Sequence, residues 1–283
     1  MDERSVQFRE WQCRERRLPL TRPLVMGIVN VTPDSFSDGG KWFDEERAVA
    51  HALELVEEGA DILDIGGEST QPGIAPVSED EECRRVLPVI RRVTAACDVP
   101  ISVDTRNAAV AREAVAAGAC IVNDVMPFAG DVAMAAVVRE TGAGMVAMHM
   151  RGTPQDMAGL TGYDDVVGEV EEELRKALVF AAEQGIAAGQ MVIDPGIGFA
   201  KDTAQNVALL AATERFTRLA PVLIGVSRKR FIGELCNEPV PTERVGGSVG
   251  IAVWCAMHGA AVVRVHDVKA TRQALTVVQA LMA

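Results

Sequence analysis

The 283-residue sequence predicts a TIM barrel, the (β/α)8 fold of the α/β class, in one domain over residues 24–283 after a short N-terminal extension, residues 1–23. The main observation is a series of eight short segments, rich in Val and Ile and apolar on both faces, as in strands of a buried parallel sheet. Helical patterns alternate with them, as eight βα units require. The predicted strands are 24–29, 61–65, 99–103, 119–122, 143–148, 190–193, 221–226 and 260–265. A doubly wound open sheet is the alternative, and we expect the extension to close the bottom of the barrel.

The predicted helices carry start and stop signals. Ser78 and Glu81 form a capping-box pattern, and Asp44, Asn107 and Asp131 stand where N-caps belong. Five of the helical patterns stop at a glycine that opens the next strand, because glycine accepts the left-handed conformation just past a helix end. These glycines are Gly59, Gly118, Gly142, Gly185 and Gly259.

Composition limits the classes of partner. The formal net charge of −12 disfavours nucleic acid and anionic membranes as partners. The six cysteines are scattered without a C-x-x-C pair, which favours free thiols in a reducing cytoplasm. The N-terminus lacks the apolar core of a signal peptide. The longest apolar run, residues 249–263, is interrupted by His258 and Gly259, so we expect a helix followed by a strand and no membrane span.

Every predicted strand ends in at least one polar residue. In a barrel these ends meet at the face that carries the chemistry. The residues are Asn30, Asp64, Asp104, Asn123, Asp124, His149, Asp194, Ser227, Arg228, Lys229, Arg264 and His266. A barrel without a binding site would not need polar groups at all eight strand ends, so the pattern predicts a site there.

Two sets of these residues indicate different ligands. Asp104, Asn123 and Asp194 suit a flat heterocycle with paired N–H donors, because one carboxylate can accept two parallel hydrogen bonds. Capping of a turn is the alternative role for Asp194. Lys229, Arg264 and His266 form a cationic set, and the last two lie two residues apart on one strand face.

In an acidic chain, such a cationic set indicates a phosphate or pyrophosphate site. The alternative for Arg264 is an ion pair with a neighbouring carboxylate such as Asp64. Long polar loops follow the first two strands, at 30–40 and 66–76. Asn30 could give one oxygen to Mg²⁺, with water and phosphate supplying the other ligands.

In order along the chain, these residues resemble the dihydropteroate synthase family. The matching segments are MGIVNVTPDSFSDGG (26–40), ADILDIGGEST (60–70), ISVDT (101–105), IVNDV (121–125), MHMRGTP (148–154), IDPGIGF (193–199), GVSRK (225–229) and RVHDV (264–268). The resemblance implies a pterin-binding TIM barrel. It implies a Mg²⁺-dependent transferase of folate biosynthesis, a target of sulfonamides. The reaction would join a hydroxymethyl-dihydropterin pyrophosphate to para-aminobenzoate and release pyrophosphate. It also implies a homodimer formed through helices late in the barrel, where Trp254 is a candidate contact.

The resemblance assigns roles residue by residue. Asp104, Asn123, Asp194 and Lys229 match pterin-binding positions, and Asp104, Lys229 and Arg264 are the expected catalytic residues. The expected pyrophosphate-binding residues are Asn30, Thr70, Arg264 and His266, with Asn30 also holding Mg²⁺. The expected aminobenzoate-binding residues are Phe36, Pro72 and Phe199, which match family positions, and Arg230, which departs from the family and could bind the aminobenzoate carboxylate.

The sequence departs from the family pattern at several positions. Gln71 replaces an arginine, and Arg230 replaces a serine after Lys229. We expect Arg230 to compensate in part for the arginine missing at Gln71. Ala200 stands where the family has glycine, and Gln205 where it has histidine.

Two other functions are compatible with the same pterin pocket. One is a methyltransferase that moves a methyl group from methyl-tetrahydrofolate to a corrinoid, but it does not need the predicted pyrophosphate site. The other is a non-catalytic pterin-binding paralogue, suggested only by Gln71 and Arg230.

Overall fold

The computed structural model describes residues 8–32, 41–69, 76–128 and 130–282. Eight parallel strands follow one another in the order β8-β7-β6-β5-β4-β3-β10-β9, and a bridge between Ile193 and Val222 joins the two ends of this order. The strands are β3 (Leu24–Asn30), β4 (Ile62–Gly66), β5 (Ile101–Asp104), β6 (Ile121–Asp124), β7 (Gly144–Met148), β8 (Met191–Asp194), β9 (Leu223–Gly225) and β10 (Val262–Val265). The predicted (β/α)8 barrel is confirmed and the open sheet is wrong.

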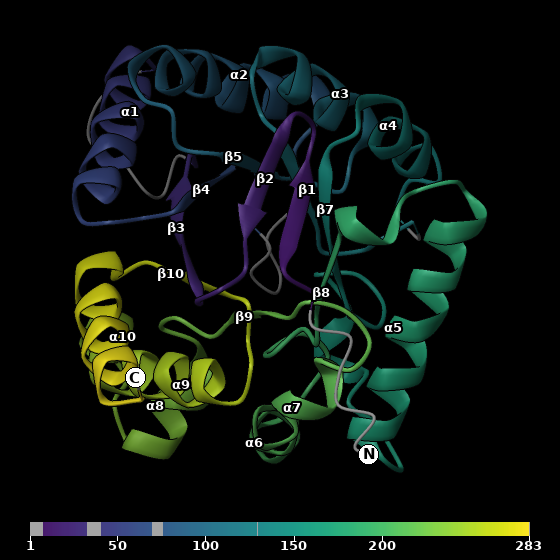
Figure 1. Cartoon of the computed structure of the whole chain (residues 1–283), viewed down its shortest axis with the longest axis vertical. Coiled ribbons are helices and arrows are strands. Elements are labelled where there is room, and N and C mark those ends of the chain that lie inside the picture. The colour runs from purple at the N-terminus through teal and green to yellow at the C-terminus, as the bar shows by residue number, and fades with distance from the viewer. Residues whose placement is uncertain (1–7, 33–40, 70–75, 129, 283) are drawn as a thin grey trace.

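Helices surround the strands on the outside (Figure 1). They are α1 (Lys41–Glu57), α2 (Glu79–Ala96), α3 (Ala108–Ala117), α4 (Met134–Thr141), α5 (Val166–Glu183), α6 (Thr203–Ala211), α7 (Thr213–Phe216), α8 (Arg230–Cys236), α9 (Val245–Met257) and α10 (Val268–Met282). The run 249–263 is indeed the end of α9 followed by β10. Among the described helices, none combines the length and apolar character that a membrane span needs. All six cysteines are free thiols.

The helix-end signals were mostly right. All five stop glycines have positive φ, from 69° at Gly142 to 124° at Gly118. Ser78 caps α2 by accepting the Glu81 N–H. Asn107 holds the N-cap position of α3, but its side chain donates to Glu82 at 2.6 Å.

Two predicted N-caps are wrong. Asp44 lies inside α1, because that helix already begins at Lys41. Asp131 lies three residues before the start of α4. Its Oδ1 accepts the Ala133 N–H at 2.9 Å, and this bond stabilises the turn that leads into the helix.

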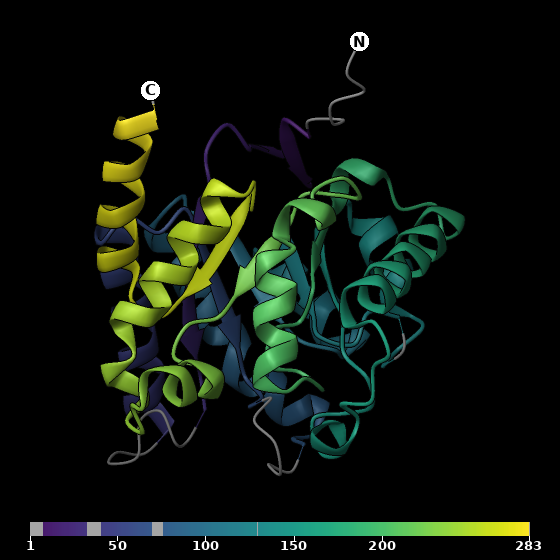
Figure 2. The same cartoon turned by 90° about the horizontal axis from the view of Figure 1, so that it is seen from below.

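A hairpin of β1 (Glu10–Cys13) and β2 (Arg16–Pro19) lies across the end of the barrel where the strands begin (Figures 1 and 2). Trp11 and Cys13 are fully buried among the first residues of the strands, and the Trp11 indole donates to the Gln190 carbonyl at 2.8 Å. Gly144 permits this approach, since a Cβ there would lie 2.6 Å from the Cys13 sulfur. One end of the barrel is therefore closed by residues 10–19, and the carboxyl ends of the strands form the opposite face.

Candidate active site

The predicted pterin-binding residues lie at the carboxyl end of the barrel. Asp104 and Asp194 are the last residues of β5 and β8, and Asn123 is the third residue of β6. Arg264 lies in β10, and Lys229 directly precedes α8. Parallel strands therefore deliver the residues to one face, as expected from the sequence.

Arg264 bridges two carboxylates. Its Nε donates to Asp64 Oδ2 at 2.5 Å and its Nη2 to Asp104 Oδ2 at 2.6 Å. The ion pair with Asp64, which the sequence left as an alternative role, is therefore formed. The side chains of Arg264 and Asp104 are still 20% and 17% exposed, whereas Asp64 is wholly buried, so the first two remain within reach of a ligand.

The environment of Asp104 disfavours its charged form. Burial raises the pKa of its carboxyl to about 7, and the carboxylates of Asp64, Glu82 and Asp124 add to this rise while Arg264 opposes it. The described part of this face holds more buried negative than positive charge close to Asp104. Such an environment is suited to a ligand that is, or becomes, cationic.

We compare the free energy of unfolding of the variant Asp104→Asn with that of the native chain. We expect the difference to shift in favour of the variant as the pH rises from 5 to 7. Below its raised pKa the folded native chain keeps the Asp104 proton that the unfolded chain loses near pH 4, so native stability falls with pH across this window. The slope is at most about 1.4 kcal/mol per pH unit. Urea unfolding at pH 5, 6, 7 and 8 measures it. A stability difference that does not change with pH would contradict the assigned environment.

Asp194 and Lys229 form the second part of the site. Asp194 Oδ1 accepts the Gly196 N–H at 2.8 Å, so the turn role considered for this residue is real, but it occupies only that oxygen. A Cβ on Gly225 would lie within 4 Å of both Asp194 Oδ2 and Arg264, so the two side chains flank one strand end. Burial raises the pKa of Asp194, and the Lys229 charge opposes this rise.

Lys229 links the carboxylates to an aromatic ring. Burial lowers its pKa to about 8, against the attraction of Asp194. Its ammonium donates to the Ile197 carbonyl and lies 4.6 Å from the centre of the Phe199 ring. Phe199, predicted to contact the aminobenzoate, is thus adjacent to the residues predicted to bind pterin.

A buried network that the sequence did not predict supports this loop. Lys201 is 6% exposed, and its Nζ lies 3.0 Å from His149 Nδ1, 3.0 Å from the Gly196 carbonyl and 2.8 Å from the Phe199 carbonyl. His149 Nε2 lies 2.9 Å from the Glu173 carboxylate, so the ring carries its proton there and accepts from Lys201 at Nδ1. This is the role of His149, which had no assigned function. The only signal in the sequence was a polar residue at a strand end.

The same loop contains a strained residue. Ala200 has φ 50°, in the left-handed region where the family pattern places glycine. This conformation costs a non-glycine residue about 1–2 kcal/mol. A glycine avoids that cost, but it also makes the unfolded chain more flexible, which offsets part of the gain.

We expect Ala200→Gly to stabilise the fold by roughly 0.5–1 kcal/mol, measured by urea unfolding. Ala182→Gly, on the exposed side of α5, is the control and should destabilise by about 1 kcal/mol. A loss of stability in both variants would contradict the strain.

The surroundings of His266 disfavour a positive charge on its ring. Burial, with the nearby Arg264 and Arg228, lowers its pKa to about 4, which favours the neutral imidazole at pH 7. Its backbone N–H donates to Ser227 Oγ at 3.1 Å, and its Nδ1 lies 3.1 Å from the same oxygen. Neutral His266 can still hydrogen-bond an anion, and at this end of β10 the positive charge comes from Arg264.

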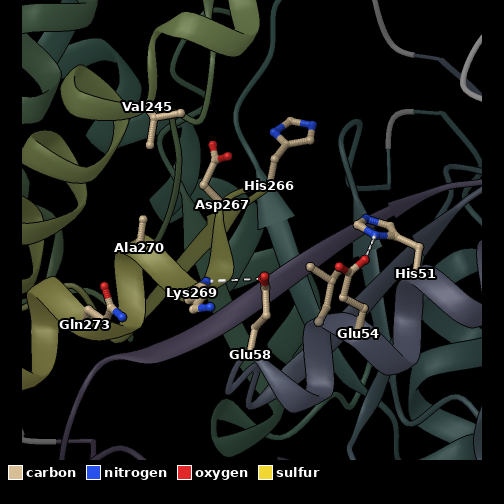
Figure 3. Close-up of a pocket in the computed structure, with 10 residues that line it drawn as sticks. His51, Glu54, Glu58, Val245, His266, Asp267, Lys269, Ala270 and Gln273 are labelled. Atoms are coloured by element: carbon tan, nitrogen blue, oxygen red, sulfur yellow. Dashed lines mark hydrogen bonds and ion pairs between the residues drawn. The ribbon is translucent and has the colours of Figure 1, made fainter.

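His266 also borders a surface hollow of about 380 Å³ between α1 and α10 (Figure 3). Its lining includes His51 and Glu54 from α1 and Lys269 from α10. Among the described residues, none of those predicted to bind pterin lines this hollow. It is thus separate from the carboxylate cluster.

The structure describes two of the remaining predicted site residues, Asn30 and Arg230. Asn30 is the exposed last residue of β3. Arg230 is 86% exposed and pairs with Glu234 at 3.1 Å, so its contact with aminobenzoate stays a prediction. Phe36, Thr70, Gln71 and Pro72 lie outside the residues that the structure describes.

The chain is similar to proteins of known function over nearly its whole length. Residues 26–266 match the family model described as pterin binding enzyme. The Escherichia coli (strain K12) dihydropteroate synthase is 45% identical over 266 residues, covering 94% of each chain. The Xanthomonas albilineans dihydropteroate synthase structure with 4-aminobenzoic acid has 51% identity and a TM-score of 0.92, covering 97% of this chain and 98% of that one. The structure of that synthase with 7,8-dihydropteroate gives 49% identity and a TM-score of 0.89, covering 97% and 99%.

The fold and the site thus define a pterin-binding barrel enzyme. Carboxylates on three strands surround an arginine at its carboxyl face, and a lysine lies beside them. Within that class, the chain belongs to the dihydropteroate synthase family.

Proposed function

We propose that this chain condenses 6-hydroxymethyl-7,8-dihydropterin pyrophosphate with para-aminobenzoate, giving dihydropteroate and pyrophosphate in folate biosynthesis. The observation that carries the proposal is the cluster of Asp64, Asp104 and Asp194 around Arg264 and Lys229. Its surplus of negative charge suits a pterin that becomes cationic as the reaction proceeds. The matched synthases and their printed complexes with 4-aminobenzoic acid and 7,8-dihydropteroate support the same substrates.

The site suggests how each group would act. Asp194 Oδ2 accepts from the pterin N–H donors, because Oδ1 is already occupied by the Gly196 N–H. Asn123 and Lys229 complete the pterin contacts. The bond between the methylene carbon and the pyrophosphate oxygen then breaks, and the electron pair leaves with pyrophosphate. Asp104 and Asp194 stabilise the resulting cation, and Arg264 lies where it can stabilise the departing anion.

The aminobenzoate nitrogen then attacks the cationic methylene and loses one proton. No covalent intermediate with the protein is needed, because the pterin ring itself spreads the positive charge. Phe199 lies beside Lys229 and would contact the aminobenzoate ring, together with Phe36, Pro72 and Arg230. Thr70 and His266 would hydrogen-bond the pyrophosphate.

Mg²⁺ fits this site only together with the substrate. Within the described residues, no three His, Cys, Asp or Glu side chains are arranged to hold a metal ion. Asn30 offers one neutral amide oxygen, which suits a hard cation whose other ligands are water and phosphate. Bound there with the substrate, Mg²⁺ would neutralise charge on the pyrophosphate group.

A homodimer and a cytoplasmic location complete the proposal. Trp254 and Met257 on α9 are 47% and 53% exposed, and Leu235 on neighbouring α8 is 59% exposed, so these helices offer apolar surface for a second copy.

The free cysteines suit a reducing compartment such as the cytoplasm. The sulfonamide complex of the Yersinia pestis synthase supports this chain as a sulfonamide target.

One assay tests the proposed reaction. The purified chain is mixed with the pterin pyrophosphate, para-aminobenzoate and Mg²⁺, and dihydropteroate and pyrophosphate are quantified. We expect the two products in equal amounts, with no product when any component is omitted. Pterin binding without product would favour the non-catalytic paralogue. Methyl transfer from methyl-tetrahydrofolate to a corrinoid would favour the methyltransferase.

A further inference from the structure

Asp64 is the one carboxylate of the cluster that cannot reach a ligand directly. It lies in the middle of β4, and its side chain is 0% exposed. Asp104 and Arg264, in contrast, are partly exposed. Asp64 can therefore influence the reaction only through the neighbours that it holds and through its charge.

A single oxygen of Asp64 holds two of those neighbours. Its Oδ2 accepts from Arg264 Nε at 2.5 Å and from Asn123 Nδ2 at 3.1 Å. The opposite orientation of the Asn123 amide would set two oxygens against each other, so the carboxylate determines which way the amide lies. The NH2 group of Asn123 is thereby turned to Asp64, and its carbonyl oxygen is the group left to accept from a ligand.

The same contact fixes Arg264. With Nε held by Asp64 and Nη2 held by Asp104, the planar guanidinium is restrained at two points. Arginine presents its donors in a rigid fork, so two anchored nitrogens define the plane of the whole group. Asp64 therefore orients the cation that faces the proposed leaving group.

Asp64 also sets the charge of the cluster. With all five groups ionised, counting Asp64, Asp104 and Asp194 against Lys229 and Arg264 leaves one surplus negative charge. Without Asp64 the ionised cluster would be neutral. A cationic pterin intermediate would then lose part of its electrostatic stabilisation.

We propose that Asp64 is a positioning residue of the synthase reaction, which fixes Asn123 as an acceptor toward the pterin, orients Arg264 toward the leaving group and supplies the surplus negative charge of the site.

The substitution Asp64→Asn tests this while keeping the shape of the side chain. We expect kcat/KM for the pterin pyrophosphate to fall at least 30-fold at pH 8, with the KM for para-aminobenzoate within threefold of the native value. The acidic limb of the kcat/KM profile should also move to lower pH by at least half a unit, because Asp104 loses a like charge beside it. The other charged groups facing Asp104 are Arg264, Glu82, Asp124 and Lys229, and they are unchanged.

Ser102→Ala is the matched control in the same layer of the barrel. Ser102 lies opposite Asp64 in the β4–β5 register, and within the described residues its hydroxyl has no hydrogen-bond partner. We expect activity and the acidic limb to stay native in this variant. A kcat/KM of Asp64→Asn within threefold of native, or an acidic limb that stays in place while the rate falls, would overturn the proposal.

A second measurement keeps the proposal testable if Asp64→Asn does not fold by itself. In a double-mutant cycle on urea unfolding, Arg264→Gln alone leaves buried Asp64 without its cation, whereas Asp64→Asn/Arg264→Gln removes both charges. We expect the double variant to have a folding equilibrium constant at least tenfold larger than Arg264→Gln. An equal or smaller constant would overturn the pairing. The activity arm rests on the proposed function, but this cycle does not, so the two can fail separately.

Discussion

Asp194→Asn is expected to weaken pterin binding by at least about 100-fold. Asp194 Oδ1 is committed to the Gly196 N–H, so the asparagine oxygen stays there and its NH2 group replaces the oxygen that faces the ligand. A donor then meets the pterin N–H donors. One lost charge-assisted hydrogen bond is worth about 1.5–3 kcal/mol, and the donor that now opposes a donor adds to this loss. Calorimetric titration with a dihydropterin measures the affinity.

Asp202→Asn is the control for this substitution. Asp202 is only eight residues away, but it caps α6 by accepting the Gln205 N–H at 2.8 Å, and asparagine is an equally good N-cap. Its pterin affinity should match that of the native chain. Native affinity in Asp194→Asn as well would remove Asp194 from the binding site.

Arg264→Lys is expected to lower kcat/KM roughly 10- to 150-fold although the charge is kept. A lysine has one nitrogen and cannot donate to Asp64 and Asp104 from two fixed positions as Arg264 does at 2.5 and 2.6 Å. One lost charge-assisted bond of about 1.5–3 kcal/mol corresponds to this range. Steady-state kinetics with both substrates measures it. Most of the loss should appear in kcat, because Arg264 is proposed to act on the leaving group.

Arg272→Lys is the control at the opposite end of the barrel. Arg272 also contacts a carboxylate, that of Asp61, and donates to the Gly59 carbonyl at 2.8 Å. This variant should lose stability but keep its kinetic constants. If Arg264→Lys kept native kcat, charge alone would suffice and the bridging geometry would have no role in the reaction.

The fold could be predicted because buried parallel strands appear in the sequence as short, continuous apolar segments. The strands of the barrel are mostly apolar on both faces, and five of the helices (α1, α3, α4, α5 and α9) are followed by a glycine with positive φ. Strand ends were less accurate. Residues such as Cys120 and Ala260 are buried and apolar but precede the first residue of β6 and β10. Hydrophobicity records burial, whereas the strand begins only where the ladder of hydrogen bonds begins.

The placement of the candidate site residues was predictable where a charged residue lies at or near the end of an apolar strand, as with Asp104, Asp194 and Arg264. The pair of Arg264 and Asp64 was expected only as an alternative, because the two residues are 200 apart in the chain and the local sequence does not show which carboxylate the fold brings to the arginine. The neutral state of His266 and the contact of Lys201 with His149 depend on burial, which the local sequence does not record. The network around Lys201 was therefore missed.

The central claim is that Asp104, Asn123, Asp194, Lys229 and Arg264 surround one pterin. A crystal structure of the chain with a bound dihydropterin pyrophosphate analogue tests it most directly. We expect the pterin ring within hydrogen-bond distance of Asp194 Oδ2 and the Asn123 carbonyl oxygen, with the pyrophosphate group on the Arg264 side. A pterin bound elsewhere, for example in the hollow between α1 and α10, with these five side chains uncontacted, would contradict it.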